Sequence, residues 1–137
     1  MPEANRTQPG VNHLDLSGPM SPEDRRLMAS LGKQATVWAF ECDPGAADDP
    51  SLIYRVMREY SEANGLTVCD SCETKYQPQG VTVVLVLQES HLLVNTWPEH
   101  GVVQVELFSC KGIDIEGLKN IASSVFQSRR TYSYSIE

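Results

Sequence analysis

The sequence predicts an α+β domain in which two amphipathic helices cover one face of a mostly antiparallel β-sheet. Three observations predict this two-layer sandwich. Six short segments have the β-branched or alternating composition of strands, and two longer segments repeat their apolar residues with the period of a helix. The order along the chain is β-α-β-β-β-β-α-β, in which successive strands can pair as hairpins. With 137 residues, 41% of them hydrophobic, the chain suits one domain with one core.

The first strand and the clearest helix lie in the N-terminal half. Residues 34–40 alternate small with larger apolar side chains, which predicts a strand, and the turn residues at 42–45 end it. The aspartates at 48–49 then provide an N-cap for a helix with Pro50 in its first turn, and the Asn-Gly pair at 64–65 ends that helix. Its apolar face is formed by Leu52, Ile53, Val56, Met57, Tyr60 and Ala63.

The middle of the chain provides most of the sheet. Residues 66–72 predict a short strand, and residues 81–87 are almost all β-branched or aliphatic, as in a central strand covered on one or both faces. Residues 91–96 and 102–108 predict two more strands, joined by turn residues at 98–101. If these two strands form an antiparallel hairpin, paired residue numbers sum to about 198–200.

The two ends of the chain differ in character. Asp114 caps a second amphipathic helix, and residues 131–136 alternate larger side chains with serine as a last strand. The apolar face of that helix contains Leu118, Ile121, Ala122, Val125 and Phe126. Residues 1–30 have four prolines and few large apolar groups, which predicts a flexible arm with one short helix at 21–28. We therefore expect a single folded domain at 31–137.

Composition limits the classes of partner. A net charge of −7 argues against nucleic acid and against anionic membrane surfaces, because both require a basic face. No apolar run approaches the roughly 18 residues of a membrane span. No apolar segment follows the charged N-terminus as it would in a signal peptide, so we expect a cytoplasmic protein.

The four cysteines indicate free thiols rather than a disulfide framework, since the chain is long enough to form a core without one. Cys69 and Cys72 form a single C-x-x-C, with neither a second pair nor a nearby histidine. A structural zinc ion takes four ligands. Two small residues at a strand end are therefore a simpler interpretation than a metal or redox site, and we expect no metal.

The register predicted for the hairpin of residues 91–96 and 102–108 brings a serine and a cysteine close together. The register places Ser90 opposite residues 108–110, close to Cys110. Taken alone, a turn serine and a small buried cysteine would be the simpler interpretation. They occur, however, within a wider pattern of Glu-Ser-His at 89–91, Thr-Trp-Pro-Glu at 96–99 and Phe-Ser-Cys at 108–110. Shorter matching segments are Leu31-Gly32, Glu41-Cys42 and Gln79-Gly80.

This pattern resembles the S-adenosylmethionine decarboxylase proenzyme family of the small bacterial type, from about residue 31 to about residue 112. The resemblance implies that the Ser90 hydroxyl attacks the carbonyl of Glu89 and that the resulting ester eliminates. The chain is thereby cut between these two residues, and Ser90 becomes a pyruvoyl group. That group forms a Schiff base with the substrate amine and accepts the electrons released with carbon dioxide, without pyridoxal phosphate or a metal.

The resemblance also assigns further roles. The thiol at Cys110 returns a proton to the substrate carbon. The family has a histidine that assists processing where this chain has Asn95, and an amide cannot take up a proton at neutral pH. His91 or Thr82 could then support processing, since Thr82 replaces a serine that helps this step in the family. Members of the family are dimers, which leads us to expect a homodimer of processed protomers.

The expected substrate depends on a second departure. Glu73 and Thr74 fall where the family has an aromatic residue, which stacks on adenine, and a histidine. A carboxylate offers no such surface but can pair with an ammonium or guanidinium group. We therefore expect L-arginine or L-ornithine as substrate, with Lys75 able to anchor a carboxylate or to neutralise Glu73. S-adenosylmethionine remains the alternative, and an unprocessed homologue with a binding or regulatory role is the second alternative.

Overall fold

Six strands pair into one sheet of order β2-β3-β4-β5-β1-β6, and every neighbouring pair is antiparallel. The computed structural model describes residues 18–136. The strands are β1 (Lys33–Phe40), β2 (Val68–Lys75), β3 (Val81–Leu87), β4 (Ser90–Trp97), β5 (Val102–Ser109) and β6 (Arg130–Ile136). The predicted α+β class and antiparallel sheet are confirmed.

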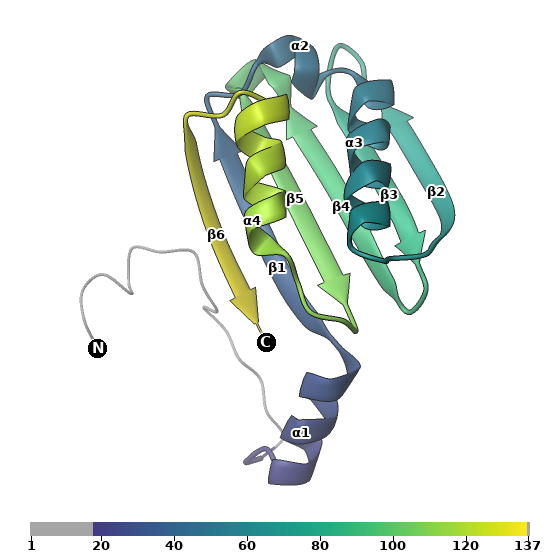
Figure 1. Cartoon of the computed structure of the whole chain (residues 1–137). Coiled ribbons are helices and arrows are strands. Elements are labelled where there is room, and N and C mark those ends of the chain that lie inside the picture. The colour runs from purple at the N-terminus through teal and green to yellow at the C-terminus, as the bar shows by residue number, and fades with distance from the viewer. Residues whose placement is uncertain (1–17, 137) are drawn as a thin grey trace, which may run out of the picture.

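The helices α3 (Pro50–Ala63) and α4 (Ile115–Asn120) lie side by side on one face of the sheet, with the short α2 (Pro44–Ala47) at its upper end (Figure 1). Both predicted caps form. The Asp49 carboxylate accepts a hydrogen bond from the amide of Leu52 at 3.1 Å, and Asp114 caps α4 in the same way.

The second predicted helix is not regular throughout. After α4 the backbone continues as a π-helical turn at Ile121–Val125. The hydroxyls of Ser123 and Ser124 both donate to the carbonyl of Asn120, and side chains that bond to the backbone in this way compete with the helical pattern. The turn ends at Phe126, which is fully buried.

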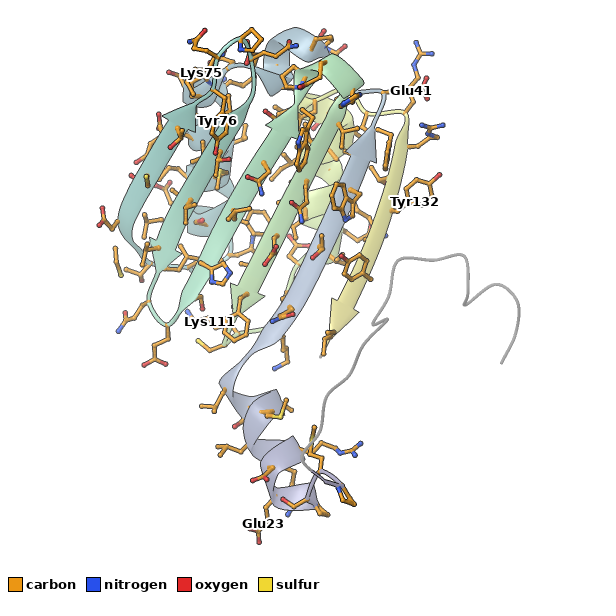
Figure 2. All side chains as sticks on the ribbon, turned by 180° about the vertical axis from the view of Figure 1, so that it is seen from behind. Glu23, Glu41, Lys75, Tyr76, Lys111 and Tyr132 are labelled. Carbon is orange, nitrogen blue, oxygen red and sulfur yellow. The ribbon has the colours of Figure 1, made fainter. Side chains whose placement is uncertain are left out.

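The core lies between the sheet and the helices. Along β3, β4 and β5 alternate residues are buried on the helix side, as the two-residue period of a strand requires. Their neighbours face the opposite side, which we call the open face. No helix covers this face in residues 18–136, and Figure 2 views it directly.

Strand boundaries differ from the sequence prediction by one to three residues, and two of these differences concern the candidate site residues. Strand β2 continues to Lys75 instead of ending at 72, because it pairs with β3 as far as Val81 and the amide of Tyr76 closes the turn on the carbonyl of Gly80 at 2.8 Å. Glu73, which follows the predicted end of this strand at residue 72, is therefore an edge-strand residue. Strand β4 begins at Ser90, one residue before the predicted start.

Helix α1 (Pro22–Leu31) begins as predicted after Ser21, whose hydroxyl accepts from the amide of Asp24 at 3.0 Å, and ends three residues later than expected. It projects beyond the end of the sheet and buries no residue (Figure 1). The predicted flexible arm at 1–30 lies mostly outside the described residues, so its boundary stays a prediction. Among residues 18–136, no helix has the length and apolar character needed to cross a membrane.

Candidate active site

The predicted cleavage site lies in the tight turn between β3 and β4. Leu87 pairs with Ser90, so Gln88 and Glu89 alone form the loop. Glu89 has a φ of 59°, in the left-handed region that side chains with a β-carbon rarely adopt, at a cost of about 1 kcal/mol. The strained residue therefore directly precedes the serine whose hydroxyl is expected to attack its carbonyl.

The register of β4 and β5 brings Ser90 to Cys110. His91 pairs with Phe108 and Leu92 with Leu107, so paired numbers sum to 199, within the predicted range. The amide N–H of Cys110 donates to Ser90 Oγ at 3.3 Å. The first strand residue and the residue just after the neighbouring strand are thus joined directly.

A pocket of about 230 Å³ opens beside this contact. Lys111 borders it, with Nζ donating to the carbonyl of Gly65 at 2.8 Å. The pocket, called here the serine pocket, is lined by Leu66, Thr67, Leu87, Gln88, Glu89, Ser90, Cys110 and Lys111. It holds the predicted nucleophile, the residue it attacks and the predicted proton donor together, beside a cationic side chain that sequence reasoning did not single out.

Thr82 and Asn95 form a second site. They pair across β3 and β4, and the Thr82 hydroxyl donates to Asn95 Oδ1 at 2.7 Å. Tyr76 Oη lies 2.9 Å from the same hydroxyl, and Asn95 Nδ2 donates to Gln104 Oε1 at 3.2 Å. A pocket of about 300 Å³, called here the asparagine pocket, is lined by Tyr76, Gln79, Gly80, Thr82, Asn95, Thr96, Trp97 and Glu99.

The two pockets lie at opposite ends of the sheet. Asn95 is five residues from Ser90 along β4, which corresponds to about 17 Å, and an odd separation places the two side chains on opposite faces. In Figure 2, Tyr76 marks the end with the asparagine pocket and Lys111 the end with the serine pocket. A single chain therefore does not bring Asn95 or Thr82 to the bond they are expected to help cleave.

His91 lies on the open face, beside rather than in the serine pocket. Its ring stacks on Phe108 with centroids 5.8 Å apart, and Nε2 is 3.9 Å from a carboxylate oxygen of Glu106. It follows Ser90 directly in β4, so the two side chains leave the strand on opposite faces.

Glu73 and Thr74 line neither pocket. Glu73 pairs with Val83 and Thr74 with Thr82 on the exposed edge strand β2. Of the two roles expected for Lys75, the pairing with Glu73 does not form, because Lys75 Nζ instead contacts the carboxylate of Asp48 at 2.9 Å. The turn that closes at Gly80 places Tyr76 in the asparagine pocket, and Tyr76 is the aromatic residue that sequence reasoning missed.

Asp48 holds that turn in place. Its Oδ1 accepts from the amide of Gly80 at 2.8 Å as well as from Lys75, so the turn is tied to the junction of α2 and α3. The hydrogen bond from Gly80, followed by that from Lys75, lowers the pKa of the Asp48 carboxyl. Nothing in the sequence pattern indicated this contact, which spans residues 48 and 80.

The cysteines are free thiols in the structure. Cys69 and Cys72 lie exposed on β2, and Cys42 is buried, where desolvation raises the pKa of its thiol. Within residues 18–136 no three His, Cys, Asp or Glu side chains are grouped so that they could hold a metal ion.

Comparisons with known proteins show which family the chain resembles. A sequence model of the S-adenosylmethionine decarboxylase family matches residues 33–137. An S-adenosylmethionine decarboxylase proenzyme of Thermotoga petrophila is 37% identical over 92 residues, which are 67% of this chain and 70% of that protein. The proenzyme of Thermosipho melanesiensis is 33% identical over 107 residues, 77% of this chain and 82% of its own.

The fold is shared with a solved structure. The crystal structure of the adenosylmethionine decarboxylase from Aquifex aeolicus superposes with a TM-score of 0.67 at 23% identity, over 77% of this chain and 88% of that one. The family match covers most of the chain and includes both pockets. The chain belongs to the S-adenosylmethionine decarboxylase family of pyruvoyl-dependent decarboxylases, which act in polyamine biosynthesis.

Proposed function

We propose that this chain cleaves itself between Glu89 and Ser90 and then decarboxylates S-adenosylmethionine. The observation that carries the proposal is the turn at Glu89, where a strained residue precedes a serine whose hydroxyl is held by the Cys110 amide. The relatives named as proenzymes support it at the level of the family.

The cleavage chemistry balances on this chain's own atoms. Ser90 Oγ attacks the carbonyl carbon of Glu89, the peptide C–N bond breaks, and the nitrogen takes the hydroxyl proton, leaving an ester. Removal of the Ser90 Cα proton then breaks the C–O bond and releases the Glu89 carboxylate. Water replaces the amino nitrogen, which leaves as ammonia, and a pyruvoyl group remains.

The residues around Ser90 fit such a group. The pocket is small, it is lined by both polar and apolar residues, and Cys110 and Lys111 are among them. A pyruvoyl group there supplies a carbonyl that accepts electrons from the substrate as carbon dioxide leaves. Cys110 can deliver a proton to the substrate carbon, because its backbone already contacts Ser90 and a thiol is a competent general acid.

S-adenosylmethionine is the substrate that the asparagine pocket favours. Tyr76 provides an aromatic ring there, which can stack on a nucleobase, and Glu99 provides a carboxylate, which can accept from ribose hydroxyls. The expectation of L-arginine or L-ornithine rested on Glu73 and on a missing aromatic residue. Glu73 lies outside both pockets and Tyr76 lies inside one, so that expectation has lost its support.

A second copy of the chain is proposed to complete each site. The open face exposes large apolar side chains across the sheet: Val86, Trp97, Tyr132, Tyr134 and Ile136, each 36% to 58% exposed. Such a surface is typical of an interface, and sheets pack face to face at about 10 Å. Suppose that the open faces of two copies pack about a twofold axis that lies between the two sheets and runs across the strands. The strands of the partner then run in the opposite direction, so the serine pocket of one protomer lies at the end of the sheet where its partner has the asparagine pocket.

The test uses freshly purified protein. Denaturing mass measurement at successive times should show the intact chain giving way to two fragments cut between Glu89 and Ser90, and Ser90→Ala should stay intact. The cleaved protein should release carbon dioxide from carboxyl-labelled S-adenosylmethionine and not from labelled arginine or ornithine. An intact chain that never cleaves would refute the proposal, and release from arginine alone would refute the substrate.

A further inference from the structure

Gln104 touches the asparagine pocket only through Asn95. It lies on β5, paired with Asn95 of β4 on one side and with Trp38 of β1 on the other. Its Oε1 accepts from Asn95 Nδ2 at 3.2 Å, while its own side chain does not line the pocket. Any influence on the pocket therefore passes through the Asn95 amide.

The hydrogen bonds of this group run in one direction. A hydroxyl has a single proton, and the proton of Thr82 goes to Asn95 Oδ1. The contact between Tyr76 and Thr82 must then have the Tyr76 hydroxyl as donor. The series of hydrogen bonds therefore runs from Tyr76 through Thr82 to Asn95, and the amide oxygen of Gln104 is its last acceptor.

Gln104 Oε1, the last acceptor, fixes the direction in which these hydrogen bonds are donated. If the Asn95 amide turned over, its NH₂ would donate to Thr82 and Thr82 would donate to Tyr76. Asn95 Oδ1 would then face Gln104 Oε1, however, and the hydrogen bond between these two residues would be lost. The observed direction leaves the Tyr76 lone pairs for a ligand in the pocket. It also leaves the second N–H of Asn95, which has no hydrogen-bond partner within residues 18–136.

We propose that Gln104 is a positioning residue, whose amide oxygen orients Asn95 and so sets which donors and acceptors the asparagine pocket presents. Its importance for the reaction rests on the proposed function, because the pocket is taken there to be part of the active site. The orientation itself does not depend on any reaction.

The orientation can be measured on protein that cannot cleave. In a ¹⁵N-labelled Ser90→Ala chain, Asn95→Asp identifies the side-chain amide pair of Asn95 by its disappearance. Gln104→Met keeps the length but removes the acceptor, so the hydrogen-bonded proton of the pair should shift upfield. Gln104→Glu keeps an acceptor and should keep the proton downfield.

Gln34→Met is the matched control. Gln34 lies on β1 of the same face and pairs with Phe108 instead of Asn95, so its replacement should leave the pair unmoved. An Asn95 pair that does not respond to Gln104→Met, or responds equally to the methionine and glutamate variants, would overturn the proposal.

The same variants in the cleavable chain test the consequence for the reaction. Gln104→Met should lower kcat/KM for S-adenosylmethionine about fivefold, the effect of one neutral hydrogen bond, with little change in Tm. Gln104→Glu should recover most of this loss. If the parent chain neither cleaves nor turns over substrate, the proposed function fails, while the amide resonances still decide the role of Gln104.

Discussion

At the scale of single residues, Asn95 has the largest expected effect on the rate of self-cleavage. It hydrogen-bonds on both sides, to Thr82 and to Gln104, so it is well placed but cannot exchange a proton. Elimination of the ester during self-cleavage requires removal of the Ser90 Cα proton. The structure therefore predicts a slow step that one substitution can accelerate.

Asn95→His should increase the first-order rate of cleavage of fresh proenzyme by about 100-fold, since a positioned base contributes at least this much. The increase in cleavage rate should be lost at pH values below about 6.5, where an imidazole is protonated and cannot accept a proton. Gel densitometry of the two fragments over time measures the rate. Asn95→Gln controls for the loss of the native amide, and equal rates for the histidine and glutamine variants would exclude a basic role at this position.

At the scale of elements, the turn between β3 and β4 carries the local strain. Two residues connect the strands, and only Glu89 of the two has a positive φ. The edge of the asparagine pocket is likewise a turn, closed at Gly80 and held by Asp48. Both turns are tied to paired strands, so their effects can be measured as changes in folding stability.

Glu89→Gly should stabilise the uncleaved Ser90→Ala chain by about 1 kcal/mol, because glycine adopts a positive φ without the clash of a β-carbon. Urea unfolding of the two proteins gives the difference. Glu89→Ala removes the carboxylate but keeps the β-carbon, so it should gain nothing. A glycine variant no more stable than the alanine variant would show that the turn is not strained.

Asp48 should make the folding stability depend on pH in the acidic range. Its folded pKa is lowered by the Gly80 and Lys75 hydrogen bonds, so its contribution is present above the unfolded value of about 3.9 and is lost as the pH falls through the folded value. The stability difference between the native chain and Asp48→Asn should therefore shrink from pH 6 towards pH 3. Asp70→Asn, on the edge strand β2 that also contains Lys75, is the control. A stability difference independent of pH would exclude the Asp48 carboxylate as the cause.

At the scale of the whole molecule, the sequence predicted the sheet better than the site. The pairing of β4 with β5 followed from strand length and turn length, which is why Ser90 and Cys110 were correctly placed together. The extent of β2 did not follow, because an exposed edge strand needs no apolar alternation. Tyr76 was missed for the same reason, since its place depends on where that strand ends.

The separation of the two pockets was also invisible in the sequence. Residues five apart look close in a motif, yet in a strand they lie on opposite faces and about 17 Å apart. A motif can therefore be local in sequence while its members serve different sites. This is the main physical reason for proposing that two chains share each site.

Mixed dimers test that sharing directly. A chain with Thr82→Ala and Asn95→Ala keeps its own Ser90 but lacks the groups of the asparagine pocket, so alone it should cleave at least tenfold more slowly than the native chain. A second chain with Ser90→Ala cannot be cut but keeps Thr82 and Asn95. Co-expression with different tags and purification through both tags should restore cleavage of the first chain, because the proposed dimer places its Ser90 at the end of the sheet where its partner has an intact asparagine pocket.

The control partner has all three substitutions, Thr82→Ala, Ser90→Ala and Asn95→Ala, and should restore nothing. Fragments from the first chain are distinguished by the mass of its tag. Rescue by both partners would mean that dimer formation alone accelerates cleavage, and rescue by neither would mean that each chain processes itself. Only rescue that depends on Thr82 and Asn95 of the partner fits a site built from two copies, which joins the two ends of the sheet that one chain keeps apart.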